Sequence, residues 1–316
     1  MKYALKRILQ FMLTMVIVSF LAFVAFDLIS GDPATALLGT ESTEEALAAL
    51  RSEMGLDQPL LVRYGQWLAG FFTGDLGTSY VYHQSVSEII APKIVVTLLL
   101  SLTSFLMILL VSIPLGLSSA KRSGGILEAL SSAVNQLCMA VPPFFTGMLL
   151  SYGFGIILKW FMPGNFPSVT EDFGGAMKHI FFAAIAISIP RIAMTVRMLK
   201  STIQSEMRKD YVRTAISRGN DRSAVLRVHV LKNSLVPVIT FLAQTMAEIV
   251  AGGIVVEQVF SIPGLGRMLV SSISNRDYPM VQAIIVILAL WVVLSGTIAD
   301  LVNQRIDPRL RLGGGR

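Results

Sequence analysis

The sequence has 316 residues, of which 53% are hydrophobic and only 15% charged. Soluble domains carry about 25% charged residues, so this composition excludes an ordinary soluble protein and indicates an all-α integral membrane protein. The net charge of +6 does not point to nucleic acid here, because the basic residues flank apolar segments and indicate membrane topology instead.

Six segments are long and apolar enough to span a bilayer, since about 20 residues at about 1.5 Å each cross about 30 Å of hydrocarbon. They lie near Ile8–Ile29, Ile94–Ala120, Ala133–Leu158, Ile180–Leu199, Leu235–Val256 and Val281–Val302. The first is longer than the apolar core of about 7–15 residues typical of a signal peptide, so we expect an uncleaved helix. Prolines at 114, 142, 143 and 190 can kink these spans.

Basic residues set the expected orientation, because Lys and Arg favour the cytoplasmic side. They cluster before the first span, at 121–122, between 200 and 233, and in the tail, whereas residues 30–92 hold eight acidic and two basic residues. Six spans place all four basic clusters on one side, with both termini in the cytoplasm. We therefore divide the chain into an N-terminus and first span (1–30), an extracytoplasmic helical segment (31–92), a five-span core (93–302) and a cytoplasmic tail (303–316).

The outer segment contains two predicted short helices. Ser42 or Thr43 can cap a helix that runs to about Met54. Gly55–Pro59 then interrupts the chain, and Leu60–Phe72 forms the second helix. Glycines at 74 and 77 and the proline at 92 interrupt the remainder. Two roles stay open for this segment, namely packing on the outer face and receiving a delivered ligand.

The segment 200–233 carries an amphipathic pattern of its own. Asp210 suits a helix start, Gly219-Asn220 suits a sharp stop, and Asp221 or Ser223 can begin another helix. Such a basic amphipathic helix can lie on anionic lipid, or it can dock its apolar face into a groove of a cytoplasmic partner. The pattern alone leaves both interpretations open.

Glu248 is the clearest charge inside a predicted span. A carboxylate at the bilayer centre costs about 2.5–3.5 kcal/mol, so it usually faces a bundle interior or a water cavity. Glu248 precedes Ala251-Gly252-Gly253, where small residues allow close helix approach. It can line a pathway and meet a cationic group, or it can bond to a partner subunit. Glu257, near the end of the same span, is expected at the lipid–water boundary, as are Asp27 and Asp300 near other span ends.

Catalytic and metal-binding patterns are missing from the sequence. There is no Gly-Lys pair, and hence no glycine-rich loop of the kind that cradles ATP phosphates. The single cysteine, Cys138, and three scattered histidines, His83, His179 and His229, do not form a metal-ligand pattern. We expect no catalytic site, no metal site and no cofactor bound by this chain.

Asp210–Ala215, followed by Gly219 and by His229–Ile239, resembles the coupling loop of ABC importer permeases. Other motifs appear in the order found in the family that imports oligopeptides, dipeptides and nickel: Gly31–Pro33, Gly55–Pro59, Gly74–Gly77, Val255–Phe260, Pro263–Arg267, Arg276–Pro279, Val281–Gln282 and Asp307–Arg309. The resemblance covers essentially the whole chain. It is strongest for the first-named permease of such systems, which has a large outer segment after its first span.

This resemblance implies a type I ABC importer transmembrane fold of six spans in a prokaryotic cytoplasmic membrane. The implied partners are a second homologous permease, two cytoplasmic ATPase subunits that bind the ATP, and an extracytoplasmic solute-binding protein. Asp210, Tyr211, Ala215 and Gly219 would belong to a coupling helix that rests in a groove of the ATPase. Closure of the ATP-bound ATPase dimer would push this helix and switch the pore from inward-facing to outward-facing.

The resemblance leaves the substrate open between peptides and nickel or metal–metallophore complexes, and peptides are favoured by their frequency in the family. A stand-alone secondary transporter is the competing class. It would show inverted repeats and paired broken helices, and the sequence has neither.

Overall fold

The computed structural model describes residues 2–29, 34–35, 43–121 and 125–306. Within these ranges the chain is helical, and its single β-bridge joins Thr78 to Ser85. The all-α prediction is confirmed. Predictions for the motifs at 31–33 and 307–309, for Ser42 and for Arg122 lie outside the described residues, as do the side chains of Lys2, Lys6, Arg7 and Asp27.

The described residues form two compact units. The first contains the chain up to Thr97 together with Pro263–Val293, and the second contains Leu98–Ile262 together with the chain from Leu294 onward. The helices of the first unit are α1 (Lys2–Ile29), α3 (Glu44–Glu53), α4 (Leu60–Thr73), the start of α5 (Val86–Lys121), α12 (Leu265–Ser274) and most of α13 (Tyr278–Ile306).

The two short helices predicted within residues 31–92 are confirmed. Thr43 caps α3 by accepting a hydrogen bond from the Ala46 amide at 3.3 Å, and Gly74 ends α4 in the left-handed conformation. In α4, Tyr64 stacks edge-on against Phe23 of α1, and its hydroxyl lies 2.9 Å from that of Ser19. These aromatic and polar contacts show that α4 packs against α1.

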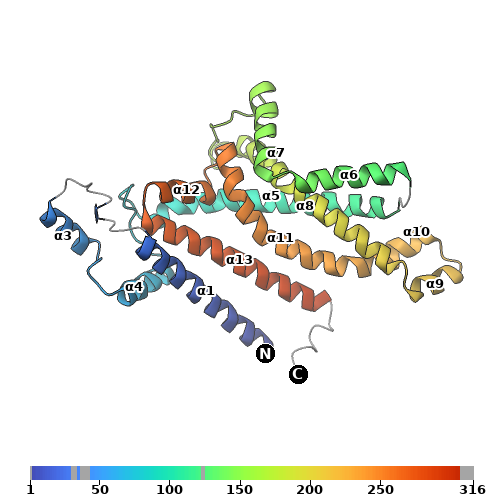
Figure 1. The fold of residues 1–316 in the computed structure, drawn as a ribbon, viewed down its shortest axis with the longest axis horizontal. Helices are drawn as coiled ribbons and strands as arrows, with labels where there is room; N and C mark the ends of the chain where they lie inside the picture. Colours follow the sequence, from blue (N-terminus) through green and yellow to red (C-terminus); the bar gives the residue numbers. More distant parts are fainter. Residues whose placement is uncertain (1, 30–33, 36–42, 122–124, 307–316) are drawn as a thin grey trace. The chain divides into compact units, whose positions relative to one another are not determined.

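The second unit holds the remaining described helices: the rest of α5, α6 (Ile126–Ala140), α7 (Pro143–Leu150), the π-helix η1 (Ser151–Ile157), α8 (Phe173–Glu206), α9 (Asp210–Ser217), α10 (Arg222–Val225), the π-helix η2 (Leu226–Val230), α11 (Leu231–Phe260) and the end of α13. Within this unit α8 is central, packed against α6, α7 and α11 (Figure 1). In the most apolar 18-residue stretch of α8, 67% of the residues are buried, whereas the same share is 33% or less in the other long apolar helices.

Small side chains let α8 occupy this central position. Ala183, Ala184 and Ala186 are fully buried on it, and small residues allow helix backbones to approach closely. On α5, a Cβ added at Gly116 would lie 2.7 Å from a terminal methyl group of Leu199 on α8. The absence of a side chain at Gly116 therefore permits the contact between α5 and α8.

Four described helices are long and apolar enough to cross a membrane: Val86–Lys121, Phe173–Glu206, Arg222–Phe260 and Tyr278–Val302. The pair Ile126–Ala140 and Pro143–Ile157 raises the number to five if it counts as one span, and the apolar part of α1, Leu9–Ala25, is shorter. The count of six spans stays a prediction.

The predicted third span, Ala133–Leu158, is divided between two helices, and the break lies at the prolines that were expected to kink it. The chain bends by 96° between α6 and α7. Val141 and Pro142 both adopt extended backbone angles there, and Pro143 begins the new helix. Proline disfavours helical angles in the residue before it and fits the first helical turn, so two consecutive prolines end one helix and start the next.

The second span also begins earlier than predicted. The helix starts at Val86, not Ile94, and runs through Pro92 to a length of 36 residues. At about 1.5 Å per residue this exceeds the roughly 30 Å of hydrocarbon. Hydropathy detects only the apolar part of a helix, so it misses the more polar turns before Ile94 that belong to α5.

Candidate functional site

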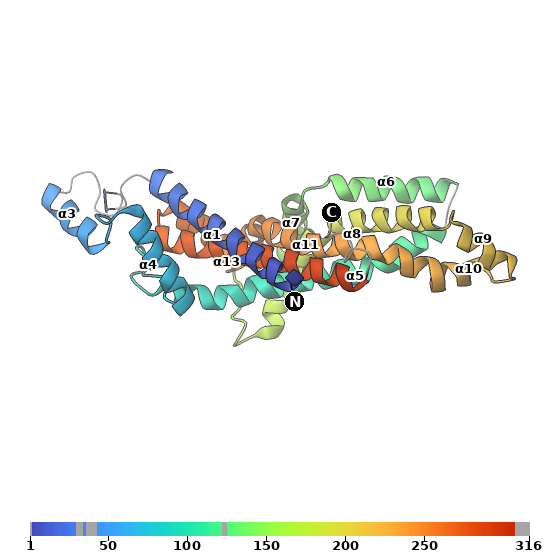
Figure 2. The ribbon, with the colours of Figure 1, turned by 90° about the horizontal axis from the view of Figure 1, so that it is seen from below.

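The helix α9 lies at the end of α8 and α11, beyond the apolar parts of both (Figure 2). It begins at Asp210, as predicted, and an acidic residue in the first turn favours the positive end of the helix dipole. Its buried anchor is Val212, which is 1% exposed, whereas Ile216, one turn further along the same face of the helix, is 42% exposed. The loop thus presents a short helix with an apolar residue left uncovered.

Tyr211 ties α9 to both neighbouring long helices. Its hydroxyl donates to Glu206 at the end of α8 at 2.9 Å, and the Asn233 amide at the start of α11 donates to the same hydroxyl at 3.3 Å. Glu206 also pairs with Lys209. Burial and the bond to Glu206 raise the pKa of the Tyr211 phenol, so it remains a protonated donor at neutral pH. Tyr211 therefore holds α9 in place and is only partly free to contact another subunit.

The turn after α9 has the predicted chemistry. Gly219 has φ +87°, in the left-handed region that favours glycine. The amide and side chain of Asn220 both donate to the Ala215 carbonyl, at 3.3 and 3.0 Å. Asp221 then caps α10 by accepting from the amides of Ser223 and Ala224. Asp210, Tyr211, Ala215 and Gly219, the four residues predicted for coupling, thus lie together on α9 and its closing turn.

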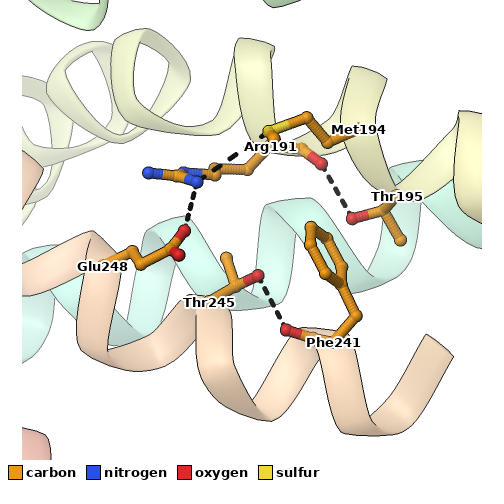
Figure 3. Close-up of polar contacts among 6 residues, drawn as sticks. All are labelled: Arg191, Met194, Thr195, Phe241, Thr245 and Glu248. Carbon is orange, nitrogen blue, oxygen red and sulfur yellow. Dashed lines mark hydrogen bonds and ion pairs between the residues drawn. The ribbon is translucent and has the colours of Figure 1, made fainter. Parts of the chain in front are cut away.

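Glu248 lies apart from α9, in the middle of α11, where it forms an ion pair with Arg191 of α8 (Figure 3). The Glu248 side chain is 50% exposed and that of Arg191 25% exposed. The sequence reasoning missed Arg191. The available signal was an arginine at the centre of the predicted span Ile180–Leu199, since cations within spans are rare and usually functional.

The exposed face around Glu248 is not covered by this chain. Gln244 and Ala251, one turn to either side, are also exposed, and a Cβ added at Gly252 would meet nothing within 4 Å. No helix among the described residues approaches Gly252 closely, so the close approach that the small residues permit stays a prediction. A face with Gln and Glu cannot lie against lipid without a large penalty, so it needs water or another protein.

Glu257 departs from the expectation of an interfacial side chain, because it is only 1% exposed. Protein therefore surrounds this carboxylate at the end of α11. A buried carboxylate is stable only with compensating interactions, and the position of Glu257 near the end of a span gave no indication of that enclosure.

The first unit contains a buried polar clamp, formed by Ser79, Tyr80 and Asp277, that joins the segment just after the Gly74–Gly77 motif to the Arg276–Pro279 motif. Asp277, which is 1% exposed, accepts from the Ser79 hydroxyl and from the Tyr80 amide at 3.1 Å. Burial raises the pKa of the Tyr80 phenol to about 12. Beside the clamp lies a cavity of about 370 Å³ lined partly by Arg63, Trp67 and Tyr278. Whether this outer cavity receives a ligand stays a prediction.

No group of three or more His, Cys, Asp or Glu residues within the described ranges is placed to hold a metal ion. His179 instead lies 3.0 Å from the backbone carbonyls of both Met162 and Gly175. Its ring joins the start of α8 to the preceding loop.

An all-helical chain with several apolar spans and an exposed amphipathic helix between two of them defines a polytopic membrane protein with a candidate docking element. Residues 112–312 match the model of the family described as binding-protein-dependent transport system inner membrane component. Residues 1–103 match the N-terminal model of the same systems. The chain belongs to this family, and its fold is the type I ABC importer transmembrane fold.

Three relatives are similar over nearly their full length. A probable peptide ABC transporter permease protein of Sinorhizobium fredii is 31% identical over 98% of this chain and 99% of the relative. A putative peptide transport system permease protein of Brucella abortus is 34% identical over 97% and 98%. A glutathione transport system permease protein of Salmonella typhimurium is 32% identical over 98% and 99%. The resemblance to ABC importer permeases is confirmed.

Proposed function

We propose that this chain is the permease subunit of an ABC importer that translocates peptides across the cytoplasmic membrane. The observation that carries the proposal is α9, a short helix fastened to α8 and α11 with Ile216 exposed, in a chain of the binding-protein-dependent family. The chain has no ATPase site and binds no cofactor. It works with a second related permease, two ATPase subunits and an extracytoplasmic binding protein, and both termini are cytoplasmic.

The contacts of Tyr211 support a mechanical role for α9. Because one hydroxyl contacts Glu206 on α8 and Asn233 on α11, a force on α9 acts on both long helices together. Closure of the ATPase dimer displaces α9, and the two spans follow as units because helices are stiff along their axes. The exposed Ile216 enters a groove of the ATPase, as an amphipathic helix does in helix-in-groove recognition.

A crosslinking experiment tests this docking. In the assembled importer, Ile216→Cys is expected to crosslink to a cysteine placed in the ATPase groove, with a yield that changes when ATP is added. Val228→Cys is the matched control, because Val228 is 62% exposed but lies on η2, outside α9. Crosslinking of Ile216→Cys to lipid alone, with no ATPase co-purifying, would contradict the docking role.

Peptides are favoured as the substrate class over nickel because the similar relatives are named for peptide and glutathione transport. The importer reconstituted in proteoliposomes with its binding protein should take up a labelled short peptide in an ATP-dependent manner. Excess unlabelled peptide should compete, and free or chelated nickel should not. ATP-driven uptake of nickel without peptide uptake would assign the other substrate class.

We also propose that Glu248 lines the translocation pathway together with Arg191. The pair lies within two spans, and half of the Glu248 side chain faces away from this chain. A peptide carries an ammonium group at one end and a carboxylate at the other, so the two residues offer complementary charges to a zwitterion. The competing role is a bond from Glu248 to the second permease.

A double-mutant cycle separates these roles. Glu248→Gln and Arg191→Gln each leave one charge without its partner, so each should lower the melting temperature of the complex. The double variant removes both charges and should recover stability, because coupled residues are not additive. With a pathway role, the double variant remains at least tenfold slower in uptake. Recovery of uptake along with stability would show a structural pair, and loss of the second permease on purification would show a subunit contact.

A further inference from the structure

A second cavity lies in the other unit, where α5, α8 and α10 end near one another. Its volume is about 620 Å³, and three cations line it: Lys121 at the end of α5, Arg208 just after α8 and Arg222 at the start of α10. Neither the coupling role of α9 nor the charged pair of α8 and α11 involves these residues. Their convergence from three separate elements therefore requires its own explanation.

None of these three cations has an acidic partner among the described residues. By contrast, Arg191, Lys200, Lys209 and Arg213 each pair with a carboxylate in the same unit. The one acidic residue at the cavity, Asp221, accepts hydrogen bonds from the amides of Ser223 at 2.9 Å and Ala224 at 3.2 Å. The cavity thus carries an excess of positive charge that the described chain does not neutralise.

One part of the cavity wall is apolar. Ile203 is 1% exposed and Leu226 5% exposed, and Met207 lies beside them. The cavity is at the polar ends of the spans, since α5 ends at Lys121 and α8 ends at Glu206. A ligand that fits combines a negative charge for the rim with a hydrocarbon portion for the wall, at the depth of the lipid headgroups.

We propose that this cavity binds the phosphate headgroup of an anionic phospholipid, with the start of an acyl chain against the apolar wall. Basic pockets between transmembrane helices on the cytoplasmic side bind phospholipid headgroups in this way. An acidic patch of the ATPase could pair with the cations, but it would leave the apolar wall without a hydrocarbon contact. A free phosphate ion would leave the apolar wall uncovered as well. Because Arg208 and Asp221 flank α9 on both sides, the bound lipid fixes the base of the coupling segment.

The test measures lipid retained by the intact importer complex, purified in detergent and exposed to phosphatidylglycerol or phosphatidylcholine before native mass spectrometry. Arg208→Gln with Arg222→Gln should weaken phosphatidylglycerol binding about thirtyfold, given the attraction typical of each cation for anionic lipid. Arg227→Gln with Lys232→Gln is the matched control, because it removes the same charge from exposed positions outside the cavity. The variant Arg208→Lys with Arg222→Lys keeps both charges and should bind phosphatidylglycerol as the natural sequence does.

Selective phosphatidylglycerol binding that is lost in the cavity variant and kept in the control variant supports the proposal. Equal retention by both variants overturns it. Displacement of the lipid by millimolar inorganic phosphate, with no dependence on acyl chains, overturns it in favour of free phosphate. Loss of the ATPase from the cavity variant with unchanged lipid retention overturns it in favour of a protein contact. These readouts use no transported substrate, so they are independent of the proposed peptide transport.

Discussion

The turn at Gly219 allows a sharp test of the proposed coupling of α9 to transport. The substitution is Gly219→Val, which places a β-branched side chain at φ +87°. A Cβ built at this position meets nothing within 4 Å. The added Cβ therefore clashes with no neighbouring residue, and we assign the effect of the substitution to the local backbone.

The expected size follows from that backbone strain. A non-glycine residue in the left-handed region costs roughly 1–2 kcal/mol, and a β-branched residue is disfavoured most. This penalty lowers the ratio of the native turn to other turns about fivefold to thirtyfold. Asparagine tolerates the left-handed region, so Gly219→Asn should be nearly neutral and Gly219→Ala intermediate.

The assay is the amount of solute imported per ATP hydrolysed by the importer in proteoliposomes, with permease content measured in the same vesicles. Gly219→Val should insert normally and hydrolyse ATP, but import several times less solute per ATP, and Gly219→Asn should resemble the natural sequence. If Gly219→Val imports as much per ATP as the natural sequence, the turn does not position α9 for coupling and the reasoning fails.

Two further predictions concern the packing of α8. Tyr211→Phe removes the hydrogen bonds to Glu206 and Asn233, which together stabilise the position of α9 by about 1 kcal/mol. Amide hydrogen exchange in α9 should therefore accelerate about fivefold. Unchanged exchange would refute the anchoring role. Gly116→Leu should lower the yield and melting temperature of the complex because of the contact with Leu199, whereas normal stability would show that the contact between α5 and α8 can relax.

Local signals in the sequence predicted the helices of both polar segments well. Thr43, Gly74, Asp210, Gly219 and Asp221 take the helix-starting or helix-ending roles expected of their residue types. These features depend on a few neighbouring backbone groups, so residue identity decides them. The limits of the long helices were less predictable because hydropathy records lipid contact and not helix length.

Features that depend on contacts between distant segments were not predictable in the same way. The ion pair of Arg191 with Glu248 and the clamp of Ser79 on Asp277 join residues far apart in the chain. The 96° bend after α6 was detectable in part, since two consecutive prolines indicated a kink. Its size depends on how α7 packs against α8 and α11, which no local pattern records.

Two sets of polar contacts join α8 to α11: the hydrogen bonds of Tyr211 and the ion pair of Arg191 with Glu248. Together they give a route by which the proposed displacement of α9 would reach the middle of both helices. Fifteen residues separate Arg191 from Glu206 on α8, and fifteen separate Asn233 from Glu248 on α11. The Tyr211 bridge and the ion pair therefore lie about 22 Å apart along both helices. If the helices move as stiff bodies, a change in their spacing at Tyr211 must alter the Arg191–Glu248 pair as well. The site proposed to receive force from the ATPase and the charges proposed to meet the peptide are thus linked by the same two helices.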